Sequence, residues 1–243
     1  METSNKPDAP VPESLRLLPP GPSKVVWAMW TGSAGRTVRC VPTRRTICAE
    51  RDGGRWFGKL RTGRRKDAAR EWRWLHVLPL LGIRTPEPVA WIGGRGRSLL
   101  VTAAVPGRAL DAWAIEAAAS GRLAELVRAV ARDVAPIVRR LHDRGLCHRD
   151  LYWNHLFCAT PFTDASPVLL DVERVFAPRW RVRRWVVKDL AALWASVPVP
   201  VSGRAGLRFL RSYLGQSLAR HRRLMLAVIA KAQRIRAHLP RYG

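Results

Sequence analysis

The chain is short of acidic residues and, among its basic residues, of lysine. Its 243 residues include 43 Lys and Arg but only 18 Asp and Glu, which leaves a formal net charge of +25 at pH 7. Only six of the basic residues are Lys, so Arg dominates. An Arg-rich genome would explain the choice of Arg over Lys, but not the excess of positive charge. That excess favours attraction to a polyanion: nucleic acid, an anionic membrane surface or a phosphorylated glycolipid.

Cysteine and long apolar runs are scarce as well. The four cysteines are Cys40, Cys48, Cys147 and Cys158. Their spacing contains no Cys-x-x-Cys pair and predicts no zinc site, so we expect reduced thiols in a reducing cytosol. The longest charge-free run, Leu190–Gly203, is too short to span a bilayer and contains two prolines. Residues 1–23 lack the basic-then-apolar pattern of a secretion signal. We expect a cytoplasmic protein, soluble or peripheral at a membrane.

The hydrophobic content of 47% is enough for a sizeable core and argues against wholesale disorder. Polar, Pro-rich residues 1–23 are expected to form a flexible tail. Residues 24–105 favour a small β-rich lobe with one helix, and residues 106–243 favour a mostly helical lobe. The sequence therefore predicts the α+β class, in a two-lobed, protein-kinase-like arrangement with a nucleotide bound between the lobes.

Residue periodicity predicts the individual elements. Residues 24–60 are expected to form strands, because β-branched residues alternate there and Gly53-Gly54 favours a hairpin turn. The predicted strands in the first lobe are Thr37–Val41, Thr46–Glu50, Arg55–Leu60, Thr85–Trp91 and Ser98–Ala104. The predicted helices, from apolar residues at helical spacing, are Asp67–Leu78, Leu123–Arg144, Arg183–Val197 and Ala205–Gln233. A short hairpin is expected to join Leu156–Cys158 to Val168–Asp171.

One motif indicates chemistry. His148-Arg149-Asp150 is followed by Leu151, and Asp171 ends an apolar run further along the chain. In kinases the Asp of His-Arg-Asp accepts the proton of the acceptor hydroxyl, and a later Asp holds Mg²⁺ on the nucleotide phosphates. A turn-capping role is the simpler alternative for each carboxylate. Their combination with an upstream Lys favours Asp150 as the base or hydroxyl-orienting group and Asp171 as the metal ligand.

Lys59 and Glu71 complete this kinase pattern. Lys59 ends a predicted strand, from which an ammonium group can neutralise nucleotide phosphates. Glu71 follows on the next predicted helix, where it can pair with Lys59 and orient it. The alternatives are a surface Lys on an edge strand and a helix-surface Glu balancing nearby arginines. Because Lys is rare in this chain, the presence of Lys rather than Arg at position 59 favours the functional role over the surface role.

The nucleotide contacts are less sharply defined. Backbone groups of Ala103 and Val105, at the end of the last predicted strand of the first lobe, are candidates for the adenine edge. Two segments compete as the phosphate loop: the partly Gly-rich Gly32–Gly35, and Thr43–Thr46. Counting strands back from Lys59 favours the second, in which Arg44 and Arg45 would supply the charge.

Further residues surround the predicted chemistry. His155 stands where many kinases place a metal-binding Asn, with Asn154 one position earlier. Mg²⁺ prefers oxygen ligands, so His155 would reach the metal through water, bind phosphate, or leave the metal to Asn154. His148 and Arg149 are expected to brace the loop. Asp189 is expected to hold the loop's backbone N–H groups.

Together these residues resemble the lipopolysaccharide kinase (Kdo/WaaP) family from about Val41 to Gly215. The most specific segments are Arg44-Arg45-Thr46, Phe57-Gly58-Lys59, Glu71-Trp72-Arg73, Leu81–Ala90, His148–Tyr152 with His155, Leu170–Arg174 and Lys188–Ala191. A His in place of the usual Asn is itself a mark of this family. So is Asp-x-x-Arg, here Asp171 and Arg174, with Arg174 in a supporting role.

The resemblance implies ATP- and Mg²⁺-dependent phosphorylation of a sugar hydroxyl, on heptose or Kdo, in the lipopolysaccharide inner core. It also implies an anionic glycolipid as partner, either lipopolysaccharide core or a lipid A precursor, met at the inner face of the cytoplasmic membrane. Nucleic acid is then an unlikely partner. The short interval between Asp171 and Asp189 leaves little room to grip a peptide, which favours a non-protein acceptor.

Two rival functions remain. One is a kinase of the same fold that acts on a protein or a small molecule, such as an aminoglycoside phosphotransferase. The other is a non-catalytic kinase-like module that uses its basic surface on nucleic acid or membrane. The intact set of Lys59, Asp150 and Asp171 argues against the second.

Overall fold

The computed structural model describes residues 14–17, 23–51, 53–63, 68–94, 96–162, 167–215 and 218–238, without the side chains of residues 14–17 and 219–220. The chain divides into two compact units. The N-terminal unit comprises Met1–Arg73 and Glu87–Ala104, and the C-terminal unit comprises Trp74–Pro86 and Val105–Gly243. Within the described residues, no helix is long and apolar enough to cross a membrane.

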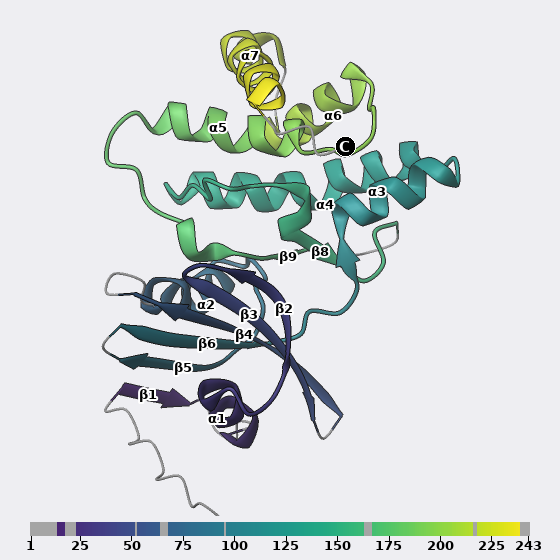
Figure 1. Cartoon of the computed structure of the whole chain (residues 1–243). Coiled ribbons are helices and arrows are strands. Elements are labelled where there is room, and N and C mark those ends of the chain that lie inside the picture. Colours follow the sequence, from purple (N-terminus) through teal and green to yellow (C-terminus); the bar gives the residue numbers. More distant parts are fainter. Residues whose placement is uncertain are drawn as a thin grey trace, which may run out of the picture. The chain divides into compact units, whose positions relative to one another are not determined.

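The N-terminal unit is built on an antiparallel sheet of six strands in the order β1-β5-β6-β4-β3-β2 (Figure 1). The strands are β1 (Ser14–Leu17), β2 (Arg36–Val41), β3 (Arg44–Arg51), β4 (Gly54–Thr62), β5 (Pro88–Gly94) and β6 (Arg97–Ala103). Strands β2 and β3, β3 and β4, and β5 and β6 follow one another in the sequence and pair with each other in the sheet. The predicted strands from Thr37 to Ala104 fall on β2 to β6.

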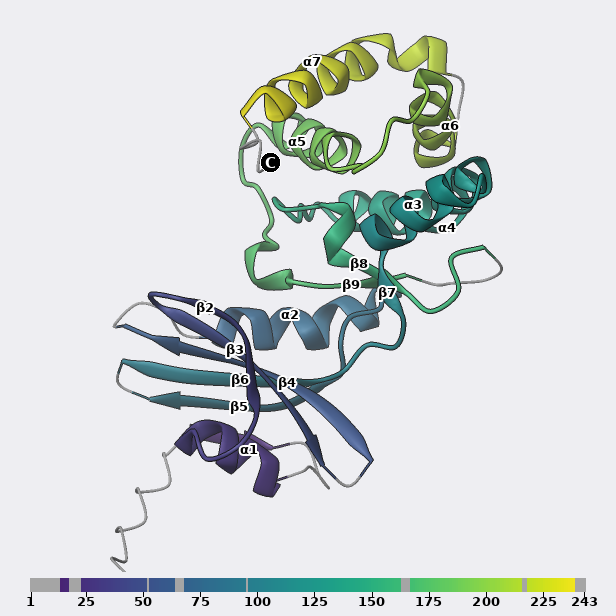
Figure 2. The ribbon, with the colours of Figure 1, turned by 45° about the vertical axis from the view of Figure 1, so that its right-hand side comes forward.

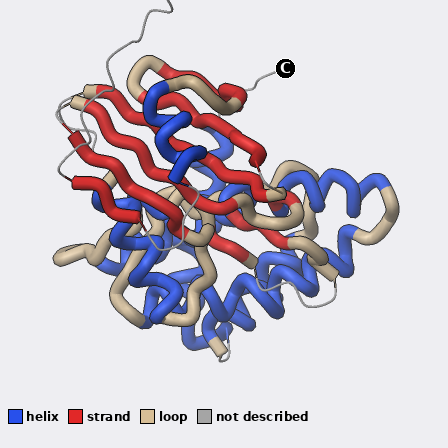
Figure 3. Tube along the Cα trace, turned by 90° about the horizontal axis from the view of Figure 1, so that it is seen from below, coloured by secondary structure: helices blue, strands red, loops and turns tan. Residues whose placement is uncertain are grey.

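Helix α1 (Ser23–Thr31) lies against one face of this sheet (Figure 3). Its residues Val25, Val26 and Met29 are buried in the same core cluster as apolar residues of β3 to β6. A Cβ atom on Gly58 of β4 would lie 2.8 Å from the sulfur of Met29. The close packing of helix on strand therefore requires glycine at this position.

Two predictions for the start of the chain were wrong. Residues 24–31 were expected to be a strand, but they form α1. The paired valines favour a strand locally, whereas the buried set of Val25, Val26 and Met29 has helical spacing. Ser14–Leu17 falls in the expected flexible tail, yet it forms β1 and pairs with β5. The remainder of that tail, residues 1–13 and 18–22, lies outside the described residues.

The C-terminal unit is mainly helical (Figure 2). Helix α2 (Ala69–Leu80) begins in the N-terminal unit and ends in this one. The other helices are α3 (Leu110–Ala119), α4 (Leu123–Asp143), α5 (Val182–Ala195), α6 (Gly203–Leu214) and α7 (Arg222–His238). Helix α6 packs on α4, and α7 packs along α5. The central helix α4 buries Leu126, Val130, Val134 and Val138, at a spacing of four residues that defines one helix face.

Three short strands and three 3-10 turns complete this unit. The strands β7 (Arg108–Ala109), β8 (Leu156–Cys158) and β9 (Val168–Leu169) form a small sheet in the order β7-β8-β9. The 3-10 turns are η1 (Trp153–His155), η2 (Val172–Arg174) and η3 (Leu218–His221). The predicted hairpin of Leu156–Cys158 with Val168–Asp171 corresponds to β8 and β9, and it brings the two loops with the predicted acids to one end of the small sheet.

The long helix predicted over Ala205–Gln233 is in fact two helices. Gly215 adopts a left-handed conformation, with φ of 61°, and ends α6. A glycine in this conformation is a frequent end of a helix. A Cβ atom there would also lie 2.3 Å from a guanidinium nitrogen of Arg139. At Pro136, in contrast, α4 continues without a break.

The cysteines differ sharply in accessibility. Cys40 is exposed and Cys48 is half-buried, whereas Cys147 and Cys158 are buried. Burial raises the pKa of Cys147 to about 12 and that of Cys158 to about 11. Only the thiolate reacts as a nucleophile, so neither buried thiol is reactive near neutral pH.

We therefore expect N-ethylmaleimide at pH 8 to modify Cys40 and Cys48 in the native protein and to spare Cys147 and Cys158. Denaturant should expose the latter two to the reagent. Mass spectrometry of peptides taken after increasing reaction times measures this directly. Rapid modification of Cys147 without denaturant would contradict the packing described here.

Candidate active site

In the N-terminal unit, a buried carboxylate joins two cations. Lys59 and Arg61 lie two residues apart on β4, so their side chains point to the same face of the sheet. Glu71, in the first turn of α2, is 3% exposed. One carboxylate oxygen lies 2.5 Å from the Lys59 ammonium nitrogen, and the other lies 2.7 Å from a guanidinium nitrogen of Arg61.

The predicted pairing of Lys59 with Glu71 is thus present in the structure. Arg61, only 4% exposed, was not singled out from the sequence. Its position two residues after Lys59 on the same strand is the signal that would have revealed it. A buried carboxylate between two cations resists the loss of any member, because removing one leaves an uncompensated charge at a cost of about 3–5 kcal/mol.

The two candidate phosphate loops lie close together. Gly32–Gly35 connects α1 to β2, while Thr43–Thr46 covers the turn before β3 and the start of that strand. A Cβ atom on Gly32 would lie 3.7 Å from a guanidinium nitrogen of Arg45. The two segments can therefore belong to the same surface, and Arg44 and Arg45 bring positive charge to it.

The segment predicted to bind adenine has one group already occupied. The N–H of Ala103, at the end of β6, donates to the carbonyl oxygen of Glu87 at 2.9 Å. The next N–H, of Ala104, donates to Arg55. From this stretch, the carbonyl of Ala103 and the N–H of Val105 are left as the groups that a ligand could use.

In the C-terminal unit, Asp189 holds the loop that carries Asp150. The Asp189 carboxylate, on α5, is fully buried. It accepts hydrogen bonds from the backbone N–H groups of His148, at 2.6 Å, and Arg149, at 2.8 Å. Arg149 adopts a left-handed conformation, with φ of 73°, that a non-glycine residue rarely takes without support. The contacts match the bracing role predicted for Asp189.

The same carboxylate links three helices. His142 of α4 donates from Nε2 to Asp189 at 3.3 Å, and its Nδ1 accepts from the hydroxyl of Tyr213 on α6 at 2.8 Å. Burial raises the pKa of the Tyr213 hydroxyl, so the group remains a donor. Together these bonds connect α4, α5 and α6 behind the loop.

His148 is placed to support the loop rather than to react. It is fully buried, and its Nε2 donates to the carbonyl of Leu170 at 3.1 Å. Burial lowers the pKa of His148, which keeps the imidazole neutral. The Arg149 guanidinium lies over the rings of Phe176 and Trp185 at 5.6 and 5.4 Å.

Two cations flank the Asp150 carboxylate. A guanidinium nitrogen of Arg174 lies 2.7 Å from one of its oxygens. The Lys188 ammonium lies 3.8 Å from the other oxygen, and it donates to the carbonyl of Arg149. Burial lowers the pKa of Lys188, although the nearby Asp150 and Asp189 act in the opposite direction.

Arg174 was expected to support the structure, and Lys188 was given no role. The structure places both against the predicted base. The argument that drew attention to Lys59, a Lys where this chain otherwise uses Arg, applies equally to Lys188. Residues 174–188 contain five Arg, and Lys188 is the only Lys among them.

Asp171 and His155 lie next to each other, and His155 contacts the backbone of Asp150. Asp171 directly precedes η2 and has a φ of 51°. His155 Nδ1 lies 2.7 Å from the carbonyl oxygen of Asp150. Because a carbonyl oxygen only accepts, Nδ1 carries the proton, and Nε2 lies 3.9 Å from an Asp171 carboxylate oxygen. Asn154 is exposed to solvent. The structure thus brings His155 to the predicted metal ligand.

This donor set fits Mg²⁺ in part. The carboxylate of Asp171, whose side chain is 30% exposed, is the kind of oxygen ligand that Mg²⁺ prefers. An imidazole nitrogen suits softer metals better. A water molecule bridging His155 to the ion would reconcile the two preferences.

Comparison with known proteins places this geometry in a family. The model of the lipopolysaccharide kinase (Kdo/WaaP) family matches residues 58–213, which include Lys59, Glu71, Asp150, Asp171 and Asp189. The chain belongs to this family. The resemblance drawn from the sequence motifs is therefore confirmed.

Named relatives agree with this assignment. The chain is 27% identical over 240 residues to the lipopolysaccharide core heptose(I) kinase WaaP of Escherichia coli K12, covering 86% of this chain and 90% of that protein. It is 29% identical over 240 residues to the protein of the same name from Pseudomonas aeruginosa PAO1, covering 86% and 89%.

Solved structures agree with it too. A structure of WaaP in complex with acyl carrier protein matches with a TM-score of 0.76 and 28% identity, covering 93% of this chain and 99% of that chain. An aminoglycoside-3'-phosphotransferase of type VIII matches with a TM-score of 0.57 and 18% identity, covering 86% and 98%, which shows a shared fold.

These matches confirm the predicted fold class: an α+β, protein-kinase-like fold with a β-rich N-terminal part and a helical C-terminal part. They also show that the chain is a phosphotransferase with an alcohol group as acceptor, because the family consists of kinases. The alternative hypothesis of a non-catalytic kinase-like module therefore does not agree with these matches.

The loop-holding contact of Asp189 can be tested through stability. Asp189→Ala removes a buried carboxylate that accepts two backbone hydrogen bonds and one from His142. Because hydrogen bonds to charged groups contribute about 1.5–3 kcal/mol each, we expect the free energy of unfolding to fall by about 3 kcal/mol or more. Urea denaturation followed by circular dichroism measures the change.

Asp143→Ala is the matched control. Asp143 is on α4, its side chain is 67% exposed, and it pairs with Arg139 at 3.3 Å. Exposed pairs contribute at most about 1 kcal/mol. Equal losses for the two substitutions would show that Asp189 does not hold the loop.

Proposed function

We propose that this chain transfers the γ-phosphoryl group of ATP to a sugar hydroxyl, on heptose or Kdo, in the lipopolysaccharide inner core. The observation that carries the proposal is that His155 contacts both the backbone of Asp150, on the loop held by Asp189, and the carboxylate of Asp171. The sugar acceptor is supported by the relatives named as heptose(I) kinases.

Asp150 orients the acceptor hydroxyl for attack in line with the leaving group. The hydroxyl oxygen forms a bond to the γ-phosphorus, the bond from that phosphorus to the bridging oxygen of ADP breaks, and the hydroxyl proton passes to the Asp150 carboxylate. Arg174 and Lys188 hold that carboxylate in place before the transfer. Most of the rate comes from such positioning and charge neutralisation.

Lys59, held by Glu71, neutralises the nucleotide phosphates, and Arg44 and Arg45 add charge from the start of β3. The carbonyl of Ala103 and the N–H of Val105 hold the adenine edge. Asp171, with His155 through water, would hold Mg²⁺, which when bound neutralises the charge of the phosphate oxygens.

An anionic glycolipid acceptor also accounts for the charge of the chain. A protein with a net charge of +25 is attracted to the anionic cytoplasmic leaflet, where such an acceptor would be met. We therefore infer a cytoplasmic enzyme that works peripherally at the inner face of the membrane.

The proposed role of Asp150 is tested by Asp150→Ala. Loss of a general base typically lowers the rate by about 10²–10⁴-fold. We expect phosphate transfer to fall by that factor while ATP affinity changes little, because Asp150 contacts the acceptor. Transfer from radiolabelled ATP and calorimetric ATP binding measure the two effects, with Asp143→Ala as control. Weakened ATP binding with transfer preserved would contradict the role.

The acceptor itself is identified by offering the purified enzyme inner-core oligosaccharide, aminoglycosides and a generic protein. Transfer to the oligosaccharide alone supports the proposal, and transfer to either of the others replaces it with the corresponding rival. Glycolipid from cells with and without the gene should differ in mass by one phosphate group.

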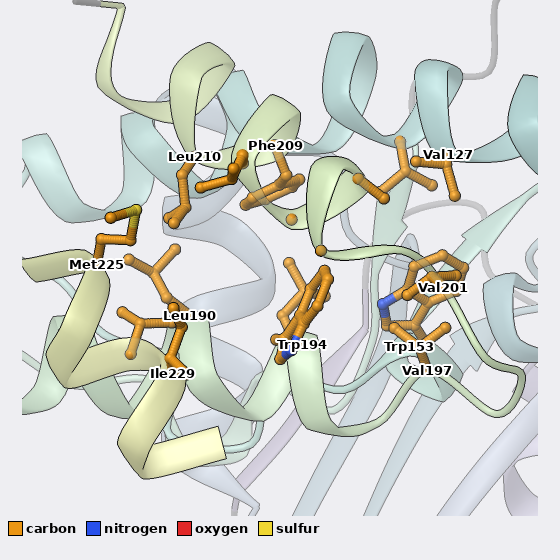
Figure 4. A pocket seen from close by; sticks show the side chains of 17 residues that line it. Val127, Trp153, Leu190, Trp194, Val197, Val201, Phe209, Leu210, Met225 and Ile229 are labelled. Atoms are coloured by element: carbon orange, nitrogen blue, oxygen red, sulfur yellow. The ribbon is translucent and has the colours of Figure 1, made fainter. Parts of the chain in front are cut away.

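A second binding role is favoured by an apolar cavity in the C-terminal unit. The cavity has a volume of about 440 Å³ and lies among α4, α5, α6 and α7. All of its lining side chains are apolar, among them Trp153, Trp194, Phe209 and Met225 (Figure 4). A space of this kind suits an alkyl chain, and the only polar groups on its lining side chains are the indole N–H groups of Trp153 and Trp194. The related WaaP structure was solved in complex with acyl carrier protein.

We therefore propose that this cavity takes the acyl chain of an acylated carrier protein. Ile229 of α7 lines the cavity and is 40% exposed, so Ile229→Trp should fill its rim. We expect this variant to lose the rise in melting temperature that acylated carrier protein gives the wild-type protein. Leu226→Trp, on the same helix at a position that does not line the cavity, should keep the rise. Equal stabilisation of both variants would contradict the proposal.

A further inference from the structure

One tryptophan of this chain is unlike the rest. Trp180 is 82% exposed, whereas the other ten, all within the described residues, are buried or half-buried. Val182, two residues later, is 43% exposed. Both belong to a segment of six consecutive exposed residues, Arg179–Arg184, at the start of α5. Because the indole ring of Trp180 is exposed to water, it does not stabilise the fold through burial. Packing therefore does not explain why a Trp occupies this position.

The arginines of Arg179–Arg184 have few contacts in the described part of the chain, where the Arg184 guanidinium lies 5.9 Å from the centre of the Trp185 ring. Arg179, Arg181, Arg183 and Arg184 are all exposed, and no salt bridge within the described part of the chain involves any of them. From residue 174 to residue 188 the sequence contains six cations and no carboxylate. The charge of this surface is therefore uncompensated locally.

Helix stability does not account for these residues either. The N-terminus of a helix disfavours cations, yet the first turn of α5 contains Arg183 and Arg184 and no acidic residue. Arg181, at the N-cap, has a left-handed φ of 54° and makes no side-chain capping bond. Residues that are unfavourable for their own helix suggest a role outside it.

We propose that Arg179–Arg184 docks on an anionic lipid bilayer. Arginine binds lipid phosphate through its guanidinium group, and the amphipathic indole ring of tryptophan is favoured at the level of the headgroups. Val182 favours a bilayer over a nucleic acid as the partner. An aliphatic side chain beside the indole is stabilised by contact with acyl chains, whereas it provides no ring on which a base could stack. The inference rests on the peripheral membrane location proposed above and names the surface responsible.

Docking through this segment has a direct relation to the active site. Arg184 and Lys188 are four residues apart on α5, so they lie on one helix face about 6 Å apart along the axis. Lys188 contacts the Asp150 carboxylate. A bilayer held by Arg184 therefore lies within about one helical turn of the group that contacts Asp150, which suits an acceptor embedded in that bilayer.

Sedimentation with lipid vesicles tests the docking surface without nucleotide or acceptor, so the result does not depend on the proposed kinase activity. The wild-type protein should bind vesicles of phosphatidylcholine with phosphatidylglycerol and not those of phosphatidylcholine alone. Because each Arg near an anionic surface contributes about fivefold in affinity, Arg181→Gln/Arg183→Gln should weaken binding about 25-fold. Trp180→Ala should weaken it further, and thermal melting checks that both variants fold.

Arg222→Gln/Arg223→Gln is the matched control, because it removes the same charge from two exposed arginines of α7. It should change vesicle affinity by less than about threefold, because neither arginine belongs to the proposed docking segment and salt screens charges away from the membrane surface. An equal loss in both double variants would assign the binding to diffuse charge and overturn the proposal.

Fluorescence places the indole itself. Subtracting the emission of Trp180→Phe from that of the wild-type protein isolates Trp180, whose emission should shift to shorter wavelength on anionic vesicles. An unshifted difference spectrum with vesicles bound would overturn the role of Trp180. Binding to a short DNA duplex that is tighter than to vesicles, and lost on the same substitutions, would assign the segment to nucleic acid instead.

Discussion

The fully buried Asp189 carboxylate is the contact on which the C-terminal unit depends. It sits on α5, yet its hydrogen-bond donors come from the loop of Asp150 and from α4, and His142 extends the network to α6. A carboxylate can remain buried and charged only when its oxygens are satisfied by donors. The helices and the loop must therefore assemble together, and the loop takes its strained conformation at Arg149 as part of folding.

The strands and the charged site residues could be predicted from the sequence, because local or periodic sequence patterns specify them. Alternation located β2 to β6, and the spacing of Lys59, Glu71, Asp150 and Asp171 matched a known chemistry. In contrast, the prediction of strands from residue 24 onward was wrong for α1, because the helical spacing of its buried residues becomes meaningful only with the sheet against which α1 packs. The break at Gly215 was missed since a single glycine inside an apolar pattern is tolerated in many helices.

Contacts between distant segments could not be read from the chain in the same way. Arg61 and Lys188 both contact the predicted site residues, but each depends on where a second element lies. Arg61 needs α2 to bring Glu71 back over β4, and Lys188 needs the loop to be drawn onto α5. The position of the His155 ring also waited for the structure, since the bond from His155 to the Asp150 carbonyl turns the ring toward Asp171.

The ion pair between Arg174 and Asp150 limits how an acceptor can approach. Arg174 occupies one carboxylate oxygen at 2.7 Å, while Lys188, at 3.8 Å, is too far for a hydrogen bond to the other. In the proposed reaction, an incoming alcohol meets only one oxygen with full accepting capacity, and it arrives from the side opposite the guanidinium. A sugar has several hydroxyl groups of similar reactivity, so this one-sided access offers a physical origin for regioselectivity.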